Sequence, residues 1–166
     1  MLIGIMSDSH GDTEATQRAV SGMLTKGCQS MFHCGDVCGS GVLDVLAAAP
    51  SVHFVWGNCD HDAARWRPYL REVGLPWPEP PVQVAMSGKT LLLAHGHEPG
   101  FDRFPRRTGV DYLLSGHTHV REDRREGAVR CINPGALYRA SIKSFATLDL
   151  ENDLLTFYRL DGTPLS

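Results

Sequence analysis

Five short motifs in the sequence combine a turn with side chains that bind metal ions. In chain order they are Asp8-Ser9-His10, Gly35-Asp36, Gly57-Asn58, His95-Gly96-His97 and Gly116-His117-Thr118-His119. Oxygen donors beside imidazole nitrogens form a mixed set that suits Mn, Fe, Zn, Ni or Co better than Ca or Mg alone. A single histidine is more often a core or surface residue, but five of the eight histidines fall in these motifs. Together the motifs predict a metal centre.

Each motif follows a short apolar run that is typical of a buried strand. The runs before the first three motifs are 2–6, 31–32 and 52–56, and amphipathic stretches at 15–24 and 42–49 predict helices between them. This alternation predicts parallel strands with crossover helices. Because ligands bind beyond the carboxyl ends of strands in α/β sheets, we expect the motifs to meet in one crevice. The glycines beside them allow sharp turns and leave room for an ion.

The second half of the chain has a different pattern. Residues 67–81 contain five prolines and are predicted to form a long connecting loop. After this loop, strands with few helices between them are predicted at 82–85, 91–94, 112–115, 129–132, 145–150 and 154–160. Ser87-Gly88-Lys89 and Glu151-Asn152-Asp153 are typical of hairpin turns. We expect one α/β domain over residues 1–166, with two β-sheets packed face to face and helices outside.

The order Asp-x-His, Gly-Asp, Gly-Asn, His-Gly-His and Gly-His-x-His resembles the calcineurin-like metallophosphoesterase superfamily, from Asp8 through Gly135. The sequence also resembles the small single-domain phosphodiesterase branch, which has Gly-Asn-Cys-Asp where most relatives have Gly-Asn-His. This chain has Gly57-Asn58-Cys59-Asp60. The resemblance implies a four-layer αββα sandwich with two mixed β-sheets, and a phosphodiesterase with a binuclear metal centre.

The resemblance also implies a role for each ligand. Asp8, His10 and His119 would hold the first metal, Asn58, His95 and His117 would hold the second, and Asp36 would bridge both. The expected cofactors are two divalent ions, Mn²⁺ first, with Fe, Zn, Ni or Co as alternatives. A hydroxide bridging the ions would attack the phosphate ester in line, with the ions clamping the phosphate oxygens.

The proton donor for the leaving group is where this sequence departs from the superfamily. The histidine after Gly-Asn is the general acid there, whereas Cys59 occupies the position here. A thiol with a pKa of about 8.5 can donate a proton, and a good leaving group such as phenolate needs no acid. His97 is the other candidate, either as an acid or phosphate contact, or as a residue that orients His95 or Asp60. Both Cys59 and His97 are candidate catalytic residues, and we expect phosphodiesters or activated esters to be preferred over alkyl monoesters.

Other residues are candidates for substrate contacts. Arg106, Arg107 and Arg139 could bind the substrate phosphate if their loops fold over the crevice. Trp56 directly precedes Gly57-Asn58, where it could stack on a base, but a core position is the favoured interpretation. Asn133-Pro134-Gly135 is interpreted as a tight turn that ends a strand.

Three other functions compete with a phosphodiesterase. A phosphomonoesterase or nucleotide phosphohydrolase would keep the chemistry and change the substrate. One branch of the fold resembles a scaffold of membrane-trafficking assemblies with an eroded metal site, but every ligand position here holds a coordinating group. A nucleic-acid enzyme is disfavoured by a net charge of −3 and a pI of about 6.2. The arginines near 103–107 and at 121–125 are interpreted as parts of solvated loops.

The composition is ordinary for a globular domain of 166 residues, with 42% hydrophobic and 21% charged residues. No apolar run of about eighteen residues is present, so no membrane partner is expected. The N-terminus lacks the features of a signal peptide, and five irregularly spaced cysteines are typical of a reduced protein. We therefore expect a cytoplasmic enzyme that acts on a small phosphate ester, with homo-oligomerisation left open.

Overall fold

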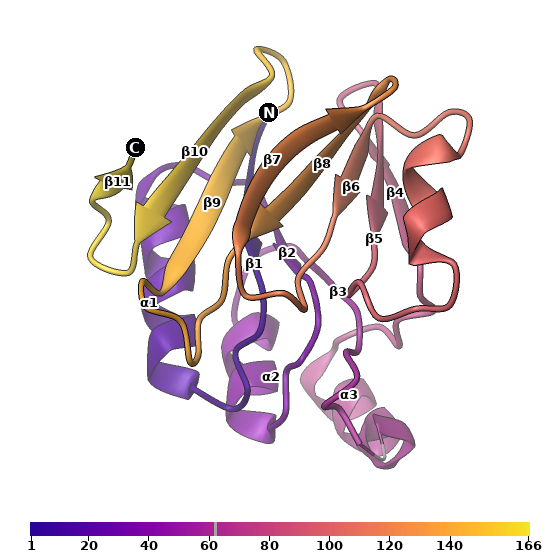
Figure 1. Ribbon diagram of the computed structural model, residues 1–166. Coiled ribbons are helices and arrows are strands. Elements are labelled where there is room, and N and C mark those ends of the chain that lie inside the picture. The colour runs from indigo at the N-terminus through magenta and orange to yellow at the C-terminus, as the bar shows by residue number, and fades with distance from the viewer. Residues whose placement is uncertain (62) are drawn as a thin grey trace.

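Two β-sheets pack face to face in the computed structural model, which describes residues 1–61 and 63–166 (Figure 1). The first sheet has the strand order β11-β10-β9-β1-β2-β3 and the second has β4-β5-β6-β8-β7. The strands are β1 (Leu2–Met6), β2 (Ser30–His33), β3 (Val52–Phe54), β4 (Val82–Met86), β5 (Lys89–Leu93), β6 (Tyr112–Leu114), β7 (Arg121–Glu126), β8 (Val129–Pro134), β9 (Ser144–Asp149), β10 (Leu154–Arg159) and β11 (Pro164–Leu165). The helices are α1 (Thr13–Thr25), α2 (Ser40–Ala47) and α3 (Arg67–Val73), with 3-10 helices η1 (Ala63–Trp66) and η2 (Phe101–Arg106).

Each sheet contains three neighbouring strands that run parallel. In the first sheet, β1 pairs with β2 and β2 with β3 in parallel, as the alternation of strands and helices predicted. In the second sheet, β6 is parallel to both β5 and β8. The other pairings are antiparallel, so both sheets are mixed, and the two predicted hairpins join β4 to β5 and β9 to β10.

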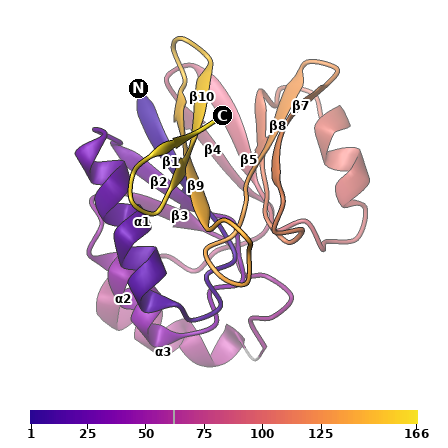
Figure 2. The ribbon, with the colours of Figure 1, turned by 60° about the vertical axis from the view of Figure 1, so that its left-hand side comes forward.

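Three apolar clusters separate four layers. Ile3 and Ile5 of β1 point between the sheets, where they meet Leu91 and Leu93 of β5. On the opposite face of β1, Met6 faces the cluster beneath α1, α2 and α3, which also contains Trp56. A third cluster lies under η2 on the outer face of the second sheet. Figure 2 shows the three α-helices on one side of the molecule and the salmon-coloured helical segment on the other. The predicted αββα sandwich is confirmed, with a 3-10 helix as one outer layer.

Helix α1 begins where the first motif ends. The Asp12 carboxylate accepts a hydrogen bond from the Ala15 N–H at 2.9 Å, which satisfies a free amide of the first turn. The same carboxylate pairs with Lys143 at 2.6 Å, so the segment between β8 and β9 is tied to the start of α1. This ion pair holds the β8–β9 segment close to the first motif.

The prediction of a loop over 67–81 is wrong for its first half. Helix α3 occupies Arg67–Val73 and ends at Gly74, whose φ of 78° closes the helix in the left-handed region. Pro68 lies in the first turn, where no intrahelical N–H bond is lost. Counting this proline as a loop residue caused the error, because only the later prolines lie outside the helix.

The prediction of a solvated loop at 121–125 is also wrong. These residues belong to β7, an edge strand paired with β8. Arg124 pairs with Glu122 and Glu126, and Asp123 pairs with Arg130 of β8, so the cluster is not a basic patch. Charged side chains at nearly every position give no apolar alternation, which is why the strand was missed. Within the described residues, no helix is long and apolar enough to cross a membrane.

Candidate metal centre

The five predicted motifs interlock at one edge of the two sheets. Asp8, after β1, donates its N–H to the Gly35 carbonyl after β2 at 3.0 Å. The Cys59 N–H, after β3, donates to the Asp36 carboxylate at 2.8 Å. The His117 N–H, after β6, donates to the Asp8 carboxylate at 3.1 Å. The carboxyl ends of the strands therefore bring the motifs together, as the sequence predicted.

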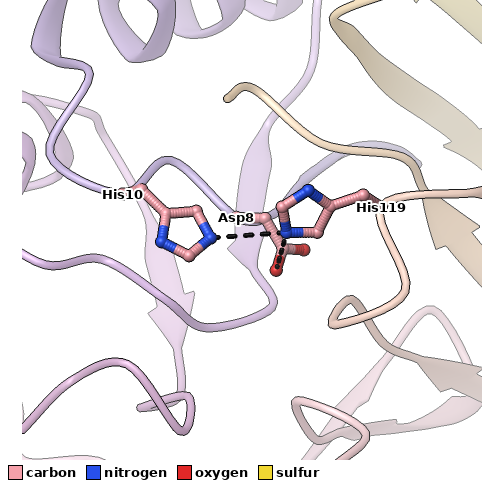
Figure 3. Close-up of side chains that lie close together, drawn as sticks. All are labelled: Asp8, His10 and His119. Atoms are coloured by element: carbon pink, nitrogen blue, oxygen red, sulfur yellow. Dashed lines mark hydrogen bonds and ion pairs between the residues drawn. The ribbon is translucent and has the colours of Figure 1, made fainter. Parts of the chain in front are cut away.

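The first group of ligand atoms comes from Asp8, His10 and His119 (Figure 3). The His119 Nε2 lies 3.3 Å from the Asp8 Oδ1 and 3.3 Å from the His10 Nε2. Figure 3 shows the two imidazole rings turned toward one another with the Asp8 carboxylate beside His119. Two residues of the chain's first motif thus meet one from its last.

The second group lies around Asp36 and His95. The His95 Nε2 is 3.5 Å from the Asp36 Oδ2 and 3.1 Å from the Asn58 Oδ1. The Asp36 Oδ2 is also 3.4 Å from the His10 Nε2, so this carboxylate reaches both groups. Asp8 also forms a group of close ligand atoms with Asp36 and His95. The two carboxylates therefore lie between the histidines of the two groups.

These donors fit divalent cations. Ligand atoms about 2.1 Å from one ion are separated by about 3.0 to 3.4 Å in octahedral or tetrahedral geometry, which matches the separations seen here. Asp8 and Asp36 are buried, at 0% and 2% exposure. Their ion-pair partners in the described part of the chain are histidines only, without any lysine or arginine. Buried carboxylates without a fixed cationic partner are the chemistry expected of a cation site.

Hydrogen bonds orient the ligand atom of His95. Its Nδ1 donates to the Cys34 carbonyl at 2.7 Å, since a carbonyl can only accept, and this leaves Nε2 facing Asp36 and Asn58. Burial alone would lower the pKa of His95, but the hydrogen bond to Asp36 raises it above its ordinary value. Burial likewise opposes ionisation of Asp36, yet hydrogen bonds from His95 and Cys59 bring its pKa well below the usual range. Asp36 is therefore a carboxylate at neutral pH.

The backbone around the centre is strained. Left-handed φ values of 43° to 71° occur at Asp8, His10, Asp36, Cys38, His117 and His119, which are six of the nine such non-glycine residues described. This conformation is costly for residues with a Cβ and concentrates at functional sites. The fold accepts this strain at the positions that bring the ligand atoms together.

Two glycines are required by close approach rather than by conformation. A Cβ on Gly116 would lie 2.5 Å from the Asp8 Oδ2, and one on Gly57 would lie 2.5 Å from the Asp36 N. Real Cβ atoms do not approach other atoms so closely, so either change would displace a candidate ligand. The expectation that glycine leaves room beside the ligands is met at these two positions.

Sequence comparison identifies the family. A model of the calcineurin-like phosphoesterase superfamily domain matches residues 1–153. The chain belongs to this superfamily. Phosphodiesterase YfcE from Escherichia coli K12 is 28% identical, over 97% of this chain and 93% of YfcE. The YfcE structure matches with a TM-score of 0.80, covering 100% of this chain and 97% of that one.

Two other solved structures share the fold of this calcineurin-like phosphoesterase. An archaeal phosphodiesterase is 23% identical, with a TM-score of 0.85 over 96% of this chain and 99% of that one. A single mutant of Vps29 from Entamoeba histolytica is 26% identical, with a TM-score of 0.69 over 99% of this chain and 96% of that one. With the family match and the YfcE relationship, the protein is a metal-dependent phosphoesterase.

The other predicted residues of this phosphoesterase lie around the two groups. The exposed His117 ring has its centroid 5.1 Å from that of His95. The His97 ring centroid lies 5.3 Å from that of His95, and its Nδ1 is 4.0 Å from Glu98. The Cys59 thiol is half-buried, and burial and the nearby Asp36 raise its pKa, so it carries its proton at neutral pH.

Two carboxylates that were not assigned a role hold the ligand loops in place. Asp60 accepts N–H bonds from Cys38 at 2.7 Å and Gly57 at 2.6 Å, which joins the loop after β2 to the loop after β3. Glu98 accepts N–H bonds from His95 and Gly96, both at 2.7 Å. Asp60 is the last residue of the Gly-Asn-Cys-Asp motif, so a signal for it was present. Its recorded partners are backbone amides rather than His97.

Of the three arginines expected to bind phosphate, Arg139 is connected to the centre through the ring of Tyr138. Its guanidinium lies 5.2 Å from the ring of Tyr138, and that ring is 5.5 Å from His10. Arg106 pairs with Glu126 at the far end of β7, and Arg107 lies over Phe104. The prediction that these two reach the crevice is not supported by their positions.

Proposed function

We propose that this protein is a phosphodiesterase with a binuclear metal centre. The observation that carries the proposal is the position of the Asp36 Oδ2, 3.4 Å from the His10 Nε2 and 3.5 Å from the His95 Nε2. One carboxylate that faces two separate histidine groups suits two ions better than one. The similarity to phosphodiesterase YfcE supports a diester as the substrate.

The ligand assignment combines the two groups with the superfamily pattern, which adds His117 to the second group. Asp8, His10 and His119 would hold the first ion, Asn58, His95 and His117 would hold the second, and Asp36 would serve both. Bound divalent ions would activate a water molecule and neutralise charge on the phosphate. The mixture of nitrogen and oxygen donors favours Mn²⁺, with Fe, Zn, Ni or Co as alternatives.

The protein's own residues supply orientation and a proton. Because the Nδ1–H of His95 donates to the Cys34 carbonyl, the neutral ring has its lone pair at Nε2, where an ion would bind. Cys59 and His97 are the two candidates for the proton that the leaving alkoxide or phenolate requires. The Cys59 thiol is half-buried beside Asp36, and burial followed by the Asp36 carboxylate raises its pKa, so it holds a proton that it can donate.

The test is hydrolysis of 4-nitrophenyl phenyl phosphate and of 4-nitrophenyl phosphate by metal-stripped protein titrated with Mn²⁺, then with the other ions. We expect turnover that returns with metal, favours the diester, and falls at least about 100-fold in Asp36→Asn, because one shared ligand charge is lost. Asp161→Asn changes an exposed aspartate in the β10–β11 turn and is the matched control. Faster monoester hydrolysis would favour a phosphomonoesterase. No turnover with any metal in folded protein would contradict the proposal.

The acid assignment has its own test. If Cys59 limits proton donation, Cys59→His should raise kcat on a diester with an alkyl leaving group and leave 4-nitrophenolate release nearly constant. The His97→Gln variant, compared in parallel, should lower only the rates for poor leaving groups if His97 is the acid instead. An unchanged dependence on leaving-group pKa in both variants would exclude both residues.

A further inference from the structure

A cavity of about 210 Å³ opens beside the metal centre and has no role so far. It is lined by His119, Val120, Arg121, Ala140, Ser141 and Ile142. His119 belongs to both features, because its Nε2 lies 3.3 Å from Asp8 within the first ligand group (Figure 3). A phosphate ester bound at the centre would therefore have this cavity next to it.

Both walls of the cavity are held in place. The wall at 140–142 is fixed by contacts on both sides of it in the chain. Before it, the Leu137 N–H donates to the Ser7 carbonyl at 3.1 Å, and after it, Lys143 pairs with Asp12 at 2.6 Å. On the other side, the Val120 N–H donates to the Thr118 hydroxyl at 3.3 Å. Side chains on fixed segments form a site before the ligand arrives, which reduces the entropy lost on binding.

The lining combines an apolar surface with one cation. Val120 is 64% exposed and is one of three large hydrophobic residues described as exposed, although it lies next to a polar centre. Ala140 and Ile142 are apolar and half-buried. Arg121 is half-buried and makes no ion pair with the described residues, whereas Arg124 of the same strand pairs with two glutamates. The complement to this lining is an apolar body that carries an anion.

The volume limits the size of that ligand. Pockets for drug-sized ligands measure about 300 to 1,000 Å³, so this cavity suits a fragment such as one ring or a short chain. A free guanidinium recognises a carboxylate or phosphate through paired hydrogen bonds. A small arm of a larger molecule, anchored by its phosphate at the centre, meets both requirements.

We propose that this cavity binds one ester arm of the substrate, a small apolar arm that bears a carboxylate or phosphate recognised by Arg121. This inference rests on the proposed function, since the arm is defined relative to a diester at the metal centre. Hydrolysis adds water across a P–O bond. The water oxygen joins phosphorus, one of its protons goes to solvent and the other stays on the new phosphate oxygen, and the bond to the leaving oxygen breaks, so that this oxygen departs with the electron pair as a phenolate. The cavity contributes binding energy to this step and specificity for the arm.

The experiment compares two diesters with the same leaving group, 4-nitrophenyl phenyl phosphate and 4-nitrophenyl 3-carboxyphenyl phosphate. We expect kcat/KM to be at least about tenfold higher for the carboxylated diester, from one charge-assisted hydrogen-bonded pair. In Arg121→Gln the ratio of the two kcat/KM values should fall to near one, and Arg121→Lys should keep part of it. Arg124→Gln removes the same charge from the same strand away from the cavity and should keep the full ratio.

A binding measurement gives a readout independent of turnover. In zinc-loaded protein, methyl resonances of Val120 and Ile142 should shift with 3-carboxyphenyl phosphate at lower concentration than with phenyl phosphate, and Arg121→Gln should remove the difference. Equal kcat/KM values for both diesters in the unmodified protein, or an unchanged ratio in Arg121→Gln, would overturn the inference. Metal-dependent turnover without a preference contradicts the cavity alone, whereas no turnover of either diester contradicts the proposed function.

Discussion

Asp60 should control both the stability of the fold and its affinity for metal. Its carboxylate is only 9% exposed and accepts three backbone N–H bonds, from Val37 and Gly57 at one oxygen and from Cys38 at the other. Asp60→Asn keeps the shape but has a single accepting oxygen. With that oxygen facing Val37 and Gly57, the new amide N–H₂ points at the Cys38 N–H, and one donor loses its partner.

The size of the effect follows from two opposing contributions. A hydrogen bond to a charged group contributes about 1.5 to 3 kcal/mol, and an unpaired donor adds a further cost. Burial raises the pKa of Asp60 more than its three hydrogen bonds lower it, so the buried charge is itself unfavourable and asparagine relieves it. We therefore expect a net loss of about 1 to 3 kcal/mol in the free energy of unfolding.

The assays are urea denaturation of metal-stripped protein and calorimetric titration with Mn²⁺. Because Asp60 joins the loops that carry Asp36 and Asn58, we expect Mn²⁺ affinity to fall by about 10- to 100-fold. Asp161→Asn is the control, since Asp161 accepts one N–H bond, from Thr163, on an exposed turn. A variant within about 0.5 kcal/mol of the unmodified protein that binds Mn²⁺ equally well would refute the view that Asp60 clamps these loops.

Two further predictions concern the groups packed beneath the centre. Gly116→Ala should lower the free energy of unfolding by about 1 to 3 kcal/mol and weaken Mn²⁺ binding, because the new Cβ would lie 2.5 Å from the Asp8 carboxylate. Gly39→Ala is the control, since the nearest atom to its Cβ is 3.8 Å away. It should lower the free energy of unfolding far less, as measured by urea denaturation. The pKa of His33 is lowered to about 3, mainly by burial and to a smaller extent by the charge of the nearby His95. His33 is thus neutral in the folded protein, whereas in the unfolded chain it takes a proton below about pH 6.5. Its contribution to the free energy of unfolding is therefore fully present above that pH. Between pH 6 and 4 the contribution is lost at about 1.4 kcal/mol per pH unit. Urea denaturation from pH 7 to 4 should show a shallower decline for His33→Gln, and parallel declines would contradict the assignment.

The fold was predictable wherever local signals agreed with tertiary structure. Apolar runs identified β1, β5 and β9 because buried strands need continuous apolar residues. Strand β7 escaped prediction because it lies at a sheet edge, where cross-strand ion pairs such as Arg130 with Asp123 replace apolar contacts. Helix α3 escaped because Pro68 occurs in the one part of a helix that tolerates proline. Both errors arose where pairing or position decides the structure.

The convergence of the candidate ligands was predictable from residue type and spacing. Every motif lies at a strand end, and the sequence carries that order directly. The distances between ligand atoms, such as 3.4 Å from the His10 Nε2 to the Asp36 Oδ2, depend on a left-handed backbone at both residues. The secondary-structure propensities of these residues do not indicate that conformation. The cavity was not predictable at all, because it joins the segment after His119 to residues 140–142 across a strand pairing.

The two kinds of information have different physical origins. A metal ligand must have a particular donor atom, so the residue type and the neighbouring residues in the sequence are enough to indicate it. An organic arm needs only a surface of the right size and polarity, which Val120, Arg121 and Ile142 provide from separate segments. Metal-dependent chemistry can therefore persist in the five motifs while the substrate changes through residues such as Arg121. On this reasoning, exchanging the residues at 120, 121 and 142 should alter the preference between diesters far more than it alters Mn²⁺ affinity, and a parallel loss of both would mean that the cavity supports the metal centre instead.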